Sequence, residues 1–242
     1  SLDEINDAYD AGALSNRNMV TNGAMKVSQR ASSFTHTNVG AGTLYCLDRF
    51  KMQSDLPAMA YTVTQASDGP SGTGLVNSFK ITVNTPASSF PDNANRYFRV
   101  RHSIEAQDVQ HLVNKPCTLS FWVKSSITGQ FDVTAFALDV SGNNHFVAPY
   151  TINTANTWEK KEIFLTGPAV IDDNNEAGLD IQFQIAKSGT GYQTSSTGVW
   201  GSTKLSSTGS SSAVATTANA TWQITGVQLE VGDTATPFEH RS

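Results

Sequence analysis

The chain of 242 residues is acidic, with a net charge of -5, and only 15% of its residues are charged. Because it has no cluster of lysine and arginine to neutralise phosphates, we exclude nucleic-acid binding. No apolar run approaches the roughly 18 residues of a membrane-spanning helix, so we expect no membrane insertion.

The N-terminal segment, residues 1–16, is expected to form a separate arm. Leu2, Ile5 and Tyr9 fall near helical spacing, but the segment is too short to be a stable helix by itself. We therefore expect a short helical or extended arm, or the end of a stalk. A single domain is expected over residues 17–242.

Period-2 alternation of apolar side chains dominates the rest of the chain, which is typical of antiparallel strands with one dry and one wet face. The clearest case is LDIQFQIA at 179–186, in which Asp180, Gln182 and Gln184 are expected to face solvent. Two such sheets packed face to face bury both dry faces. The predicted fold is all-β, a jelly-roll β-sandwich of two antiparallel sheets. Further strands are expected at 78–83, 97–104, 117–126, 131–140 and 160–165.

Two segments depart from this alternation. The sequence IEAQDVQHLVNKP at 104–116 predicts one or two helical turns that lead into the strand at 117. Residues 188–219 are rich in Ser, Thr and Gly. A loop of this length without secondary structure is unusual in a compact domain, so we expect an irregular hairpin at a sheet edge.

The last strand contains a break in its alternation. Trp222 and Ile224 share one parity, whereas Val227 and Leu229 share the other. Because a slip of one residue would turn an apolar face outward, we expect a β-bulge at Gly226 that keeps both halves facing the core. This strand is predicted to be long, bent and central.

The end of the chain also resembles a known family. QLEVGDTATPFEHR at 228–241 resembles the closing motif of bacteriophage tail-fibre and tail-tip receptor-binding domains. The segments at 16–30, 44–50, 105–126 and 153–163 resemble earlier elements of the same family, in the same order. The resemblance implies a jelly roll like that of carbohydrate-binding modules, located on a virion tail fibre. It also implies a homotrimer, contacts with other virion tail proteins, and binding to a host cell-surface glycan.

Sugar binding requires aromatic rings and amide groups, which five candidate residues supply: Trp200, Tyr192, Trp122, Asn143 and Asn144. All of these except Tyr192 have an alternative. Trp200 folds back onto the sheet or into a neighbouring subunit. Trp122, which faces away from Leu119 and Phe121, lines an outer concave face or an oligomer interface. The two asparagines are also ordinary residues of a hairpin turn.

A structural calcium ion is left open, because jelly-roll modules resembling this chain often hold one. Its candidate ligands are Asp172, Asp173 and Glu176, with the region of Asp48 as another location. The alternative is that these acidic residues only form a turn between strands.

We expect no enzyme. The chain has no H-E-x-x-H or G-x-S-x-G motif, and its acidic cluster at 172–180 is better explained as a turn than as the carboxylate pair of a glycosidase. The predicted function is a non-catalytic virion adhesin. The alternatives are a structural virion protein without a ligand, such as a fibre shaft or capsid decoration, and a glycan-degrading depolymerase.

Overall fold

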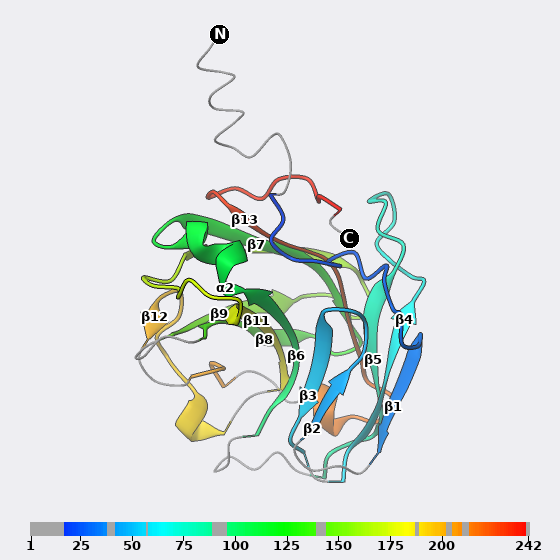
Figure 1. The fold of residues 1–242 in the computed structure, drawn as a ribbon. Coiled ribbons are helices and arrows are strands. Elements are labelled where there is room, and N and C mark those ends of the chain that lie inside the picture. Colours follow the sequence, from blue (N-terminus) through cyan, green and yellow to red (C-terminus); the bar gives the residue numbers. More distant parts are fainter. Residues whose placement is uncertain are drawn as a thin grey trace.

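Two antiparallel sheets form the fold (Figure 1). The computed structural model describes residues 17–37, 42–56, 58–88, 96–138, 144–186, 189–201, 205–209 and 213–240. The predicted arm at 1–16 and Asn143 lie outside the described residues. No helix in the described ranges is long and apolar enough to cross a membrane.

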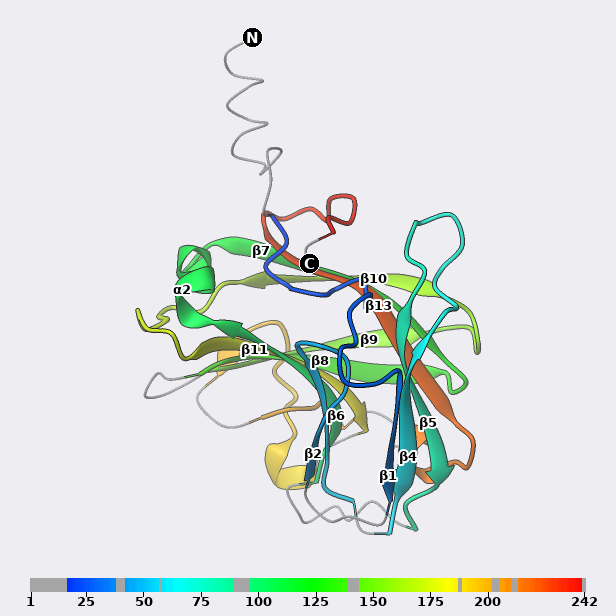
Figure 2. The same cartoon turned by 45° about the vertical axis from the view of Figure 1, so that its right-hand side comes forward.

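The first sheet has six strands in the order β1-β4-β5-β13-β7-β10, and the second has seven in the order β12-β9-β8-β11-β6-β3-β2. Figure 2 shows them as two layers, with β7, β10 and β13 in one and β6, β8 and β11 in the other. The predicted jelly-roll β-sandwich is thus confirmed. The strands of the first sheet are β1 (Ser33–Thr37), β4 (Ala60–Ala66), β5 (Ser78–Thr85), β13 (Thr221–Val231), β7 (Pro116–Ser125) and β10 (Glu159–Thr166). Those of the second are β12 (Trp200–Gly201), β9 (His145–Ile152), β8 (Gly129–Ala137), β11 (Ala177–Ala186), β6 (Phe98–Glu105), β3 (Phe50–Ser54) and β2 (Gly42–Tyr45).

Aromatic side chains from both sheets interlock in the core. Phe121 of β7 meets Phe183 of β11 edge to face, with ring centroids 5.1 Å apart, and Trp222 of β13 lies 6.2 Å from Phe183. All three side chains are buried. Edge-to-face contacts of this kind are favourable beyond the area they bury. The apolar faces that the alternation predicted for the two sheets therefore pack against each other.

Helical structure is limited to short turns. The expected helical turns before the strand at 117 are present as α2 (Ala106–Val109) and η1 (Gln110–Leu112). The others among the described residues are η2 (Thr190–Tyr192) and α3 (Ala213–Thr216).

The predicted bulge in the last strand is confirmed. The register of β13 against β7 shifts between Thr225 and Gln228, and Gly226 has φ 61°. A Cβ atom at this position would lie 2.6 Å from Leu75 Cδ1, so both the backbone conformation and the close contact favour glycine. Residues on both sides of the shift, including Trp222 and Leu229, are buried, and β13 lies between β5 and β7.

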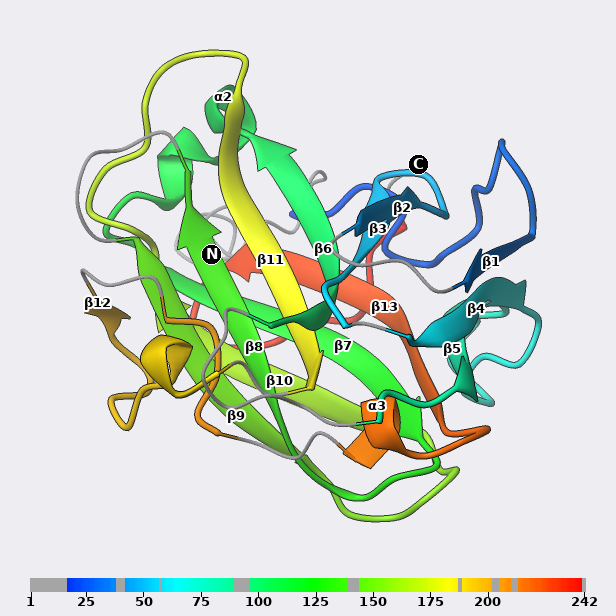
Figure 3. The ribbon, with the colours of Figure 1, turned by 90° about the horizontal axis from the view of Figure 1, so that it is seen from below.

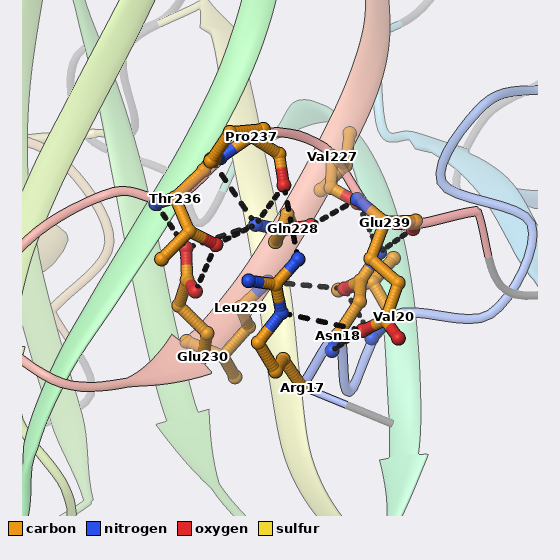
Figure 4. A network of polar contacts seen from close by, with 10 residues as sticks. All are labelled: Arg17, Asn18, Val20, Val227, Gln228, Leu229, Glu230, Thr236, Pro237 and Glu239. Carbon is orange, nitrogen blue, oxygen red and sulfur yellow. Dashed lines mark hydrogen bonds and ion pairs between the residues drawn. The ribbon is translucent and has the colours of Figure 1, made fainter. Parts of the chain in front are cut away.

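The tail after β13 packs against residues 17–20, the first residues that the structure describes (Figures 1 and 4). Asn18 is fully buried, and its amide nitrogen donates to the carbonyl oxygens of Val227 (3.3 Å) and Glu239 (3.2 Å). Its amide oxygen accepts from the backbone N–H groups of Val20 (2.9 Å) and Leu229 (3.2 Å). One side chain thus joins both ends of the described chain to the central strand.

A second part of this network lies on β13 itself. The buried carboxylate of Glu230 accepts hydrogen bonds from the backbone N–H and the hydroxyl of Thr236, at 2.9 and 2.6 Å, and from Gln228 Nε2 at 2.9 Å. Gln228 Oε1 in turn accepts from the backbone N–H of Glu239 at 2.7 Å. The polar residues of the closing motif therefore hold the tail in place.

The prediction that one face of β11 is exposed to solvent is wrong. Asp180, Gln182 and Gln184 do point away from the core, but all three are buried. Residues 189–201 and 205–209 fold back over this side: the backbone N–H of Gly198 donates to Val147 O, and Thr134 Oγ1 donates to Ser206 O, both at 2.9 Å. Figure 3 shows this segment, including the gold turn η2, beside β8 and β9.

Residues 188–219 were expected to form an irregular hairpin at a sheet edge. The edge position is confirmed, because β12 pairs with β9 at the end of the seven-stranded sheet. The hairpin is wrong for the described part of the segment, where Gln193 and Ser207 form a parallel bridge.

Glu159 organises the turn between β9 and β10. Its carboxylate accepts hydrogen bonds from the backbone N–H groups of Asn153 and Thr154, both at 2.8 Å, and lies 2.6 Å from Lys161 Nζ. Burial raises the pKa of this carboxyl, but the hydrogen bonds outweigh burial and lower the pKa from 4.5 to about 2.

We expect Glu159→Gln to lower the free energy of unfolding at neutral pH by about 1 to 2 kcal/mol, less than the full pKa shift implies because solvent screens part of the interaction. Because the folded-state pKa is below the unfolded-state pKa, the stabilisation is complete above pH 4.5 and is lost as the pH falls toward 2. Urea unfolding across this range should show a flatter pH dependence in the variant. The control is Glu162→Gln on the same strand, whose exposed pair with Lys160 should contribute less than about 1 kcal/mol. An equal flattening in both variants would contradict the assignment.

Candidate ligand-binding face

The outer face of the seven-stranded sheet carries polar side chains in cross-strand rows. Lys51 of β3 is opposite Arg101 of β6, and Arg101 is opposite Gln182 of β11. In the next row Gln53 is opposite Arg99, which is opposite Gln184. Side chains opposite each other on one face lie about 5 Å apart at Cβ, so these residues form one continuous surface.

Hydrogen bonds hold this surface in a defined arrangement. Gln53 Oε1 accepts from Arg99 Nε (3.2 Å) and from Arg101 Nη1 (3.0 Å). Arg99 Nη1 also donates to Gln182 Oε1 at 2.9 Å. Arg101 forms an ion pair with the fully buried carboxylate of Asp180. The guanidinium groups are thus oriented before any ligand arrives.

Burial and like charges act together on the cations of this face. Burial lowers the pKa of Lys51, and Arg101 and Arg99 lower it further. Burial, followed by Arg101, lowers the pKa of Arg99 to about 10. Both directions reflect the cost of keeping positive charges close together and partly out of water.

A cavity of about 180 Å³ opens over this face. Phe136 and His145 form one wall, with their rings stacked at a centroid distance of 4.0 Å and an interplanar angle of 24°. Tyr192 of η2 and Ser206 line the cavity from the segment that folds back. The remaining lining residues are Arg99, Arg101 and Gln182. Aromatic rings, amides and guanidinium donors therefore converge on one cavity.

A second cavity of about 250 Å³ lies toward the β2 edge of the same sheet. Lys51 and Ser103 line it on the side of Arg101, and the half-exposed Tyr45 lines it together with Arg30, whose guanidinium lies 5.4 Å from the Tyr45 ring centroid. The adjacent cations Lys51, Arg99 and Arg101 thus lie between two cavities.

Among the predicted ligand residues, Tyr192 lies in the cavity with the stacked rings. Trp200 lines a neighbouring cavity of about 320 Å³ that also includes His145. Its Nε1 donates to Thr166 O at 2.7 Å, and its ring is tilted against Phe146, 5.9 Å away. Trp200 therefore packs partly against the sandwich, the alternative that the sequence left open.

The other predicted residues lie elsewhere. Trp122 is on the outer face of the six-stranded sheet, in a cavity of about 190 Å³ that Leu75 and Phe238 also line, so it does not share a site with Tyr192. Asn144 is buried just before β9, and its carbonyl oxygen accepts from the backbone N–H of Ala137 at 2.9 Å.

The predicted calcium ligands are not gathered into a site. Asp172, Asp173 and Glu176 are all exposed, and Asn174 Oδ1 accepts from the backbone N–H of Glu176 at 2.8 Å. Within the described ranges, no group of three or more His, Cys, Asp or Glu side chains is arranged to hold a metal ion. The turn at 172–176 therefore does not fit a calcium ion.

Sequence reasoning missed Arg99, Arg101, Gln182 and Phe136. The signal was present in YFRVRHSI, where Arg99 and Arg101 alternate with buried Phe98 and Val100. Such alternation places both arginines on one face of one strand, which is a usable indication of a binding surface.

No model of a known protein family matches the chain, and no curated protein sequence matches it. Solved structures with a similar fold include the enzymatically active domain of tailspike protein 4 of bacteriophage CBA120. It has 16% identity and a TM-score of 0.47, and the match covers 89% of this chain and 22% of that one. This chain therefore spans about a fifth of the length of that tailspike chain.

Two carbohydrate-binding modules are also similar. One is a family 61 module in complex with β-1,4-galactotriose, with 12% identity, a TM-score of 0.41, and coverage of 90% of this chain and 100% of that one. The other is the family 11 module of Clostridium thermocellum in complex with a β-1,3-1,4-mixed-linked tetrasaccharide, with 12% identity, a TM-score of 0.38, and coverage of 82% and 99%. At these identities the likeness concerns the fold alone.

Proposed function

We propose that this chain is a non-catalytic glycan-binding module that acts as an adhesin on a virion tail fibre. The observation that carries the proposal is the cavity on the outer face of the seven-stranded sheet. There Phe136, His145 and Tyr192 offer rings for the C–H face of a pyranose, while Gln182 and Arg99 offer groups for its hydroxyls. The hydrogen bonds that orient these groups reduce the cost of ordering them on binding.

The placement of carboxylates supports the non-catalytic part of the proposal. Asp132 and Asp180 both lie on this face, on neighbouring strands β8 and β11. Asp132 is opposite Gln184, which is four residues from Asp180 along β11. At the rise of a β-strand, this offset separates the backbone positions of the two aspartates by about 13 Å. A glycosidase pair is about 5 to 9.5 Å apart. Asp132 also accepts from Thr208, and Asp180 is paired with Arg101.

The virion part of the proposal rests on the resemblance of the closing motif and the earlier segments to tail-fibre receptor-binding domains. Several copies on one fibre would raise the avidity of a weak single site. The purified domain should compete with phage adsorption to host cells, and light scattering should show a trimer. A domain that leaves adsorption unchanged would support the structural alternative, and release of reducing ends from host polysaccharide would support the depolymerase.

We expect Phe136→Ala or Tyr192→Ala to weaken glycan binding by about tenfold, because loss of one ring contact costs roughly 1.4 kcal/mol. An array of bacterial surface polysaccharides identifies a bound glycan, and titration calorimetry measures its affinity for each variant. Phe164→Ala, which removes an exposed ring from the outer face of the six-stranded sheet, should leave binding unchanged.

The same titrations include Trp122→Ala. Loss of binding in this variant, together with unchanged binding in Phe136→Ala and Tyr192→Ala, would move the site to the other sheet. Unchanged binding in all three variants would contradict a glycan site on either face.

A further inference from the structure

Three cations lie together on the outer face of β3 and β6. Lys51 is directly opposite Arg101, and Arg99 is two residues from Arg101 on the same face of the same strand. The spacing between adjacent strands and between alternate residues keeps these groups within about 5 to 7 Å at their Cβ atoms. We call Lys51, Arg99 and Arg101 the cation row.

Carboxylates neutralise this row only in part. Asp180 pairs with Arg101. Arg99 meets neutral groups instead: the amide oxygens of Gln53 and Gln182, and the ring of Tyr97, 4.5 Å from its guanidinium carbon. Lys51 Nζ donates to Ser103 Oγ at 3.1 Å. Across the part of the chain that the structure describes, neither Arg99 nor Lys51 has an ion pair with a carboxylate.

The other charged groups nearby do not change this balance. Arg49 and Glu105 pair with each other at 3.4 Å. Asp132 is on β8, beyond β11, and its carboxylate accepts two hydrogen bonds from Thr208. The row therefore keeps an excess of positive charge in a protein whose net charge is negative.

Holding Lys51 and Arg99 here without a carboxylate partner costs free energy of folding. Partly buried cations without a counter-charge lose hydration and repel one another, and the lowered pKa values of Lys51 and Arg99 reflect both effects. An anion held by the row relieves the repulsion and offsets the lost hydration with charge-assisted hydrogen bonds, and a guanidinium fork suits the two oxygens of a carboxylate, sulfate or phosphate group.

We propose that the cation row is an anion subsite, so that the glycan bound on this face carries oxyanion groups. This inference rests on the glycan-binding function proposed above and narrows it to acidic polysaccharides. Ser103 and Lys51 line the cavity on one side of the row, and Arg99 and Arg101 line the cavity on the other. A chain crossing both cavities places a charged substituent over the row.

The test compares matched neutral and charged polymers: dextran with dextran sulfate, and galactan with polygalacturonate. The two pairs separate sulfate from carboxylate. Affinity electrophoresis of the full chain should show at least about tenfold tighter binding to one charged member than to its neutral partner, the gain expected of a charge-assisted hydrogen bond. In Arg99→Gln and Lys51→Gln this ratio should fall toward one.

The matched control is Lys80→Gln, which removes the same charge from the outer face of the six-stranded sheet and should preserve the ratio. If Lys80→Gln lowers the ratio of charged to neutral polymer affinity as much as Lys51→Gln does, the attraction is unspecific and the proposed anion subsite is overturned. Equal binding of charged and neutral polymers would also overturn it, while leaving the glycan-binding function intact.

A second measurement covers the case in which no polymer binds. Galacturonate is titrated into the protein while the arginine Nε–Hε signals are followed by NMR. Shifts confined to Arg99 and Arg101, and lost in Lys51→Gln, would keep the anion subsite although the proposed polymer binding had failed. The absence of such shifts would overturn the subsite as well.

Discussion

Replacing Asn18 by alanine should lower the free energy of unfolding by about 3 to 4 kcal/mol. The amide of Asn18 has two acceptors and two donors as its partners, namely the carbonyl oxygens of Val227 and Glu239 and the backbone N–H groups of Val20 and Leu229. Truncation leaves all four without this partner in a buried region, and each unsatisfied buried group costs roughly 1 to 3 kcal/mol before relaxation. Urea unfolding measures the loss.

The hydrogen bonds of Asn18 also hold the C-terminal tail in place. Asn18 joins the start of the described chain to the tail, so its loss should also speed amide hydrogen exchange at Thr236 and Glu239, whose N–H groups bond to side chains of β13. Asn84→Ala is the control. Among the described residues, this exposed amide accepts a hydrogen bond from Thr62 Oγ1 and from no other group, so its loss should change stability by less than about 0.5 kcal/mol. Similar losses in both variants would show that the closing network contributes little.

The sequence predicted those features that depend on neighbouring residues. Alternation located the strands because it reports directly which side chains share a face. The bulge at Gly226 followed from the change of parity between Ile224 and Val227, together with the glycine between them. Both signals are local, and the structure confirms both.

Features that depend on distant segments were missed. Asp180, Gln182 and Gln184 alternate with apolar residues as solvent-facing residues do. Nothing near them in the sequence indicates that residues 189–201 and 205–209 return to cover them. The same holds for the binding face. Arg99 and Arg101 are ordinary polar residues of one strand until the register brings Lys51 and Gln53 beside them.

On the outer face of the seven-stranded sheet, breaking the ion pair of Arg101 and Asp180 should have the largest effect on stability. We expect Arg101→Met to lower the free energy of unfolding by about 3 to 5 kcal/mol, because it leaves the fully buried Asp180 carboxylate without its counter-charge. Ser103 Oγ, which donates to Asp180 Oδ1 at 2.5 Å, is then the remaining side-chain partner of this carboxylate among the described residues. Urea unfolding of the variant measures this cost.

The double variant Arg101→Met/Asp180→Leu distinguishes an unpaired charge from lost packing. If the cost is that of the unpaired charge, replacing both partners by apolar side chains should recover most of the stability, and the coupling energy should be about 2 kcal/mol or more. If the double variant is as unstable as the single one, the loss is one of packing. The double variant also tests the two roles of Arg101 separately. If its stability is recovered but it binds charged and neutral polymers equally, the ion pair of Arg101 serves the fold and its remaining donors serve the ligand.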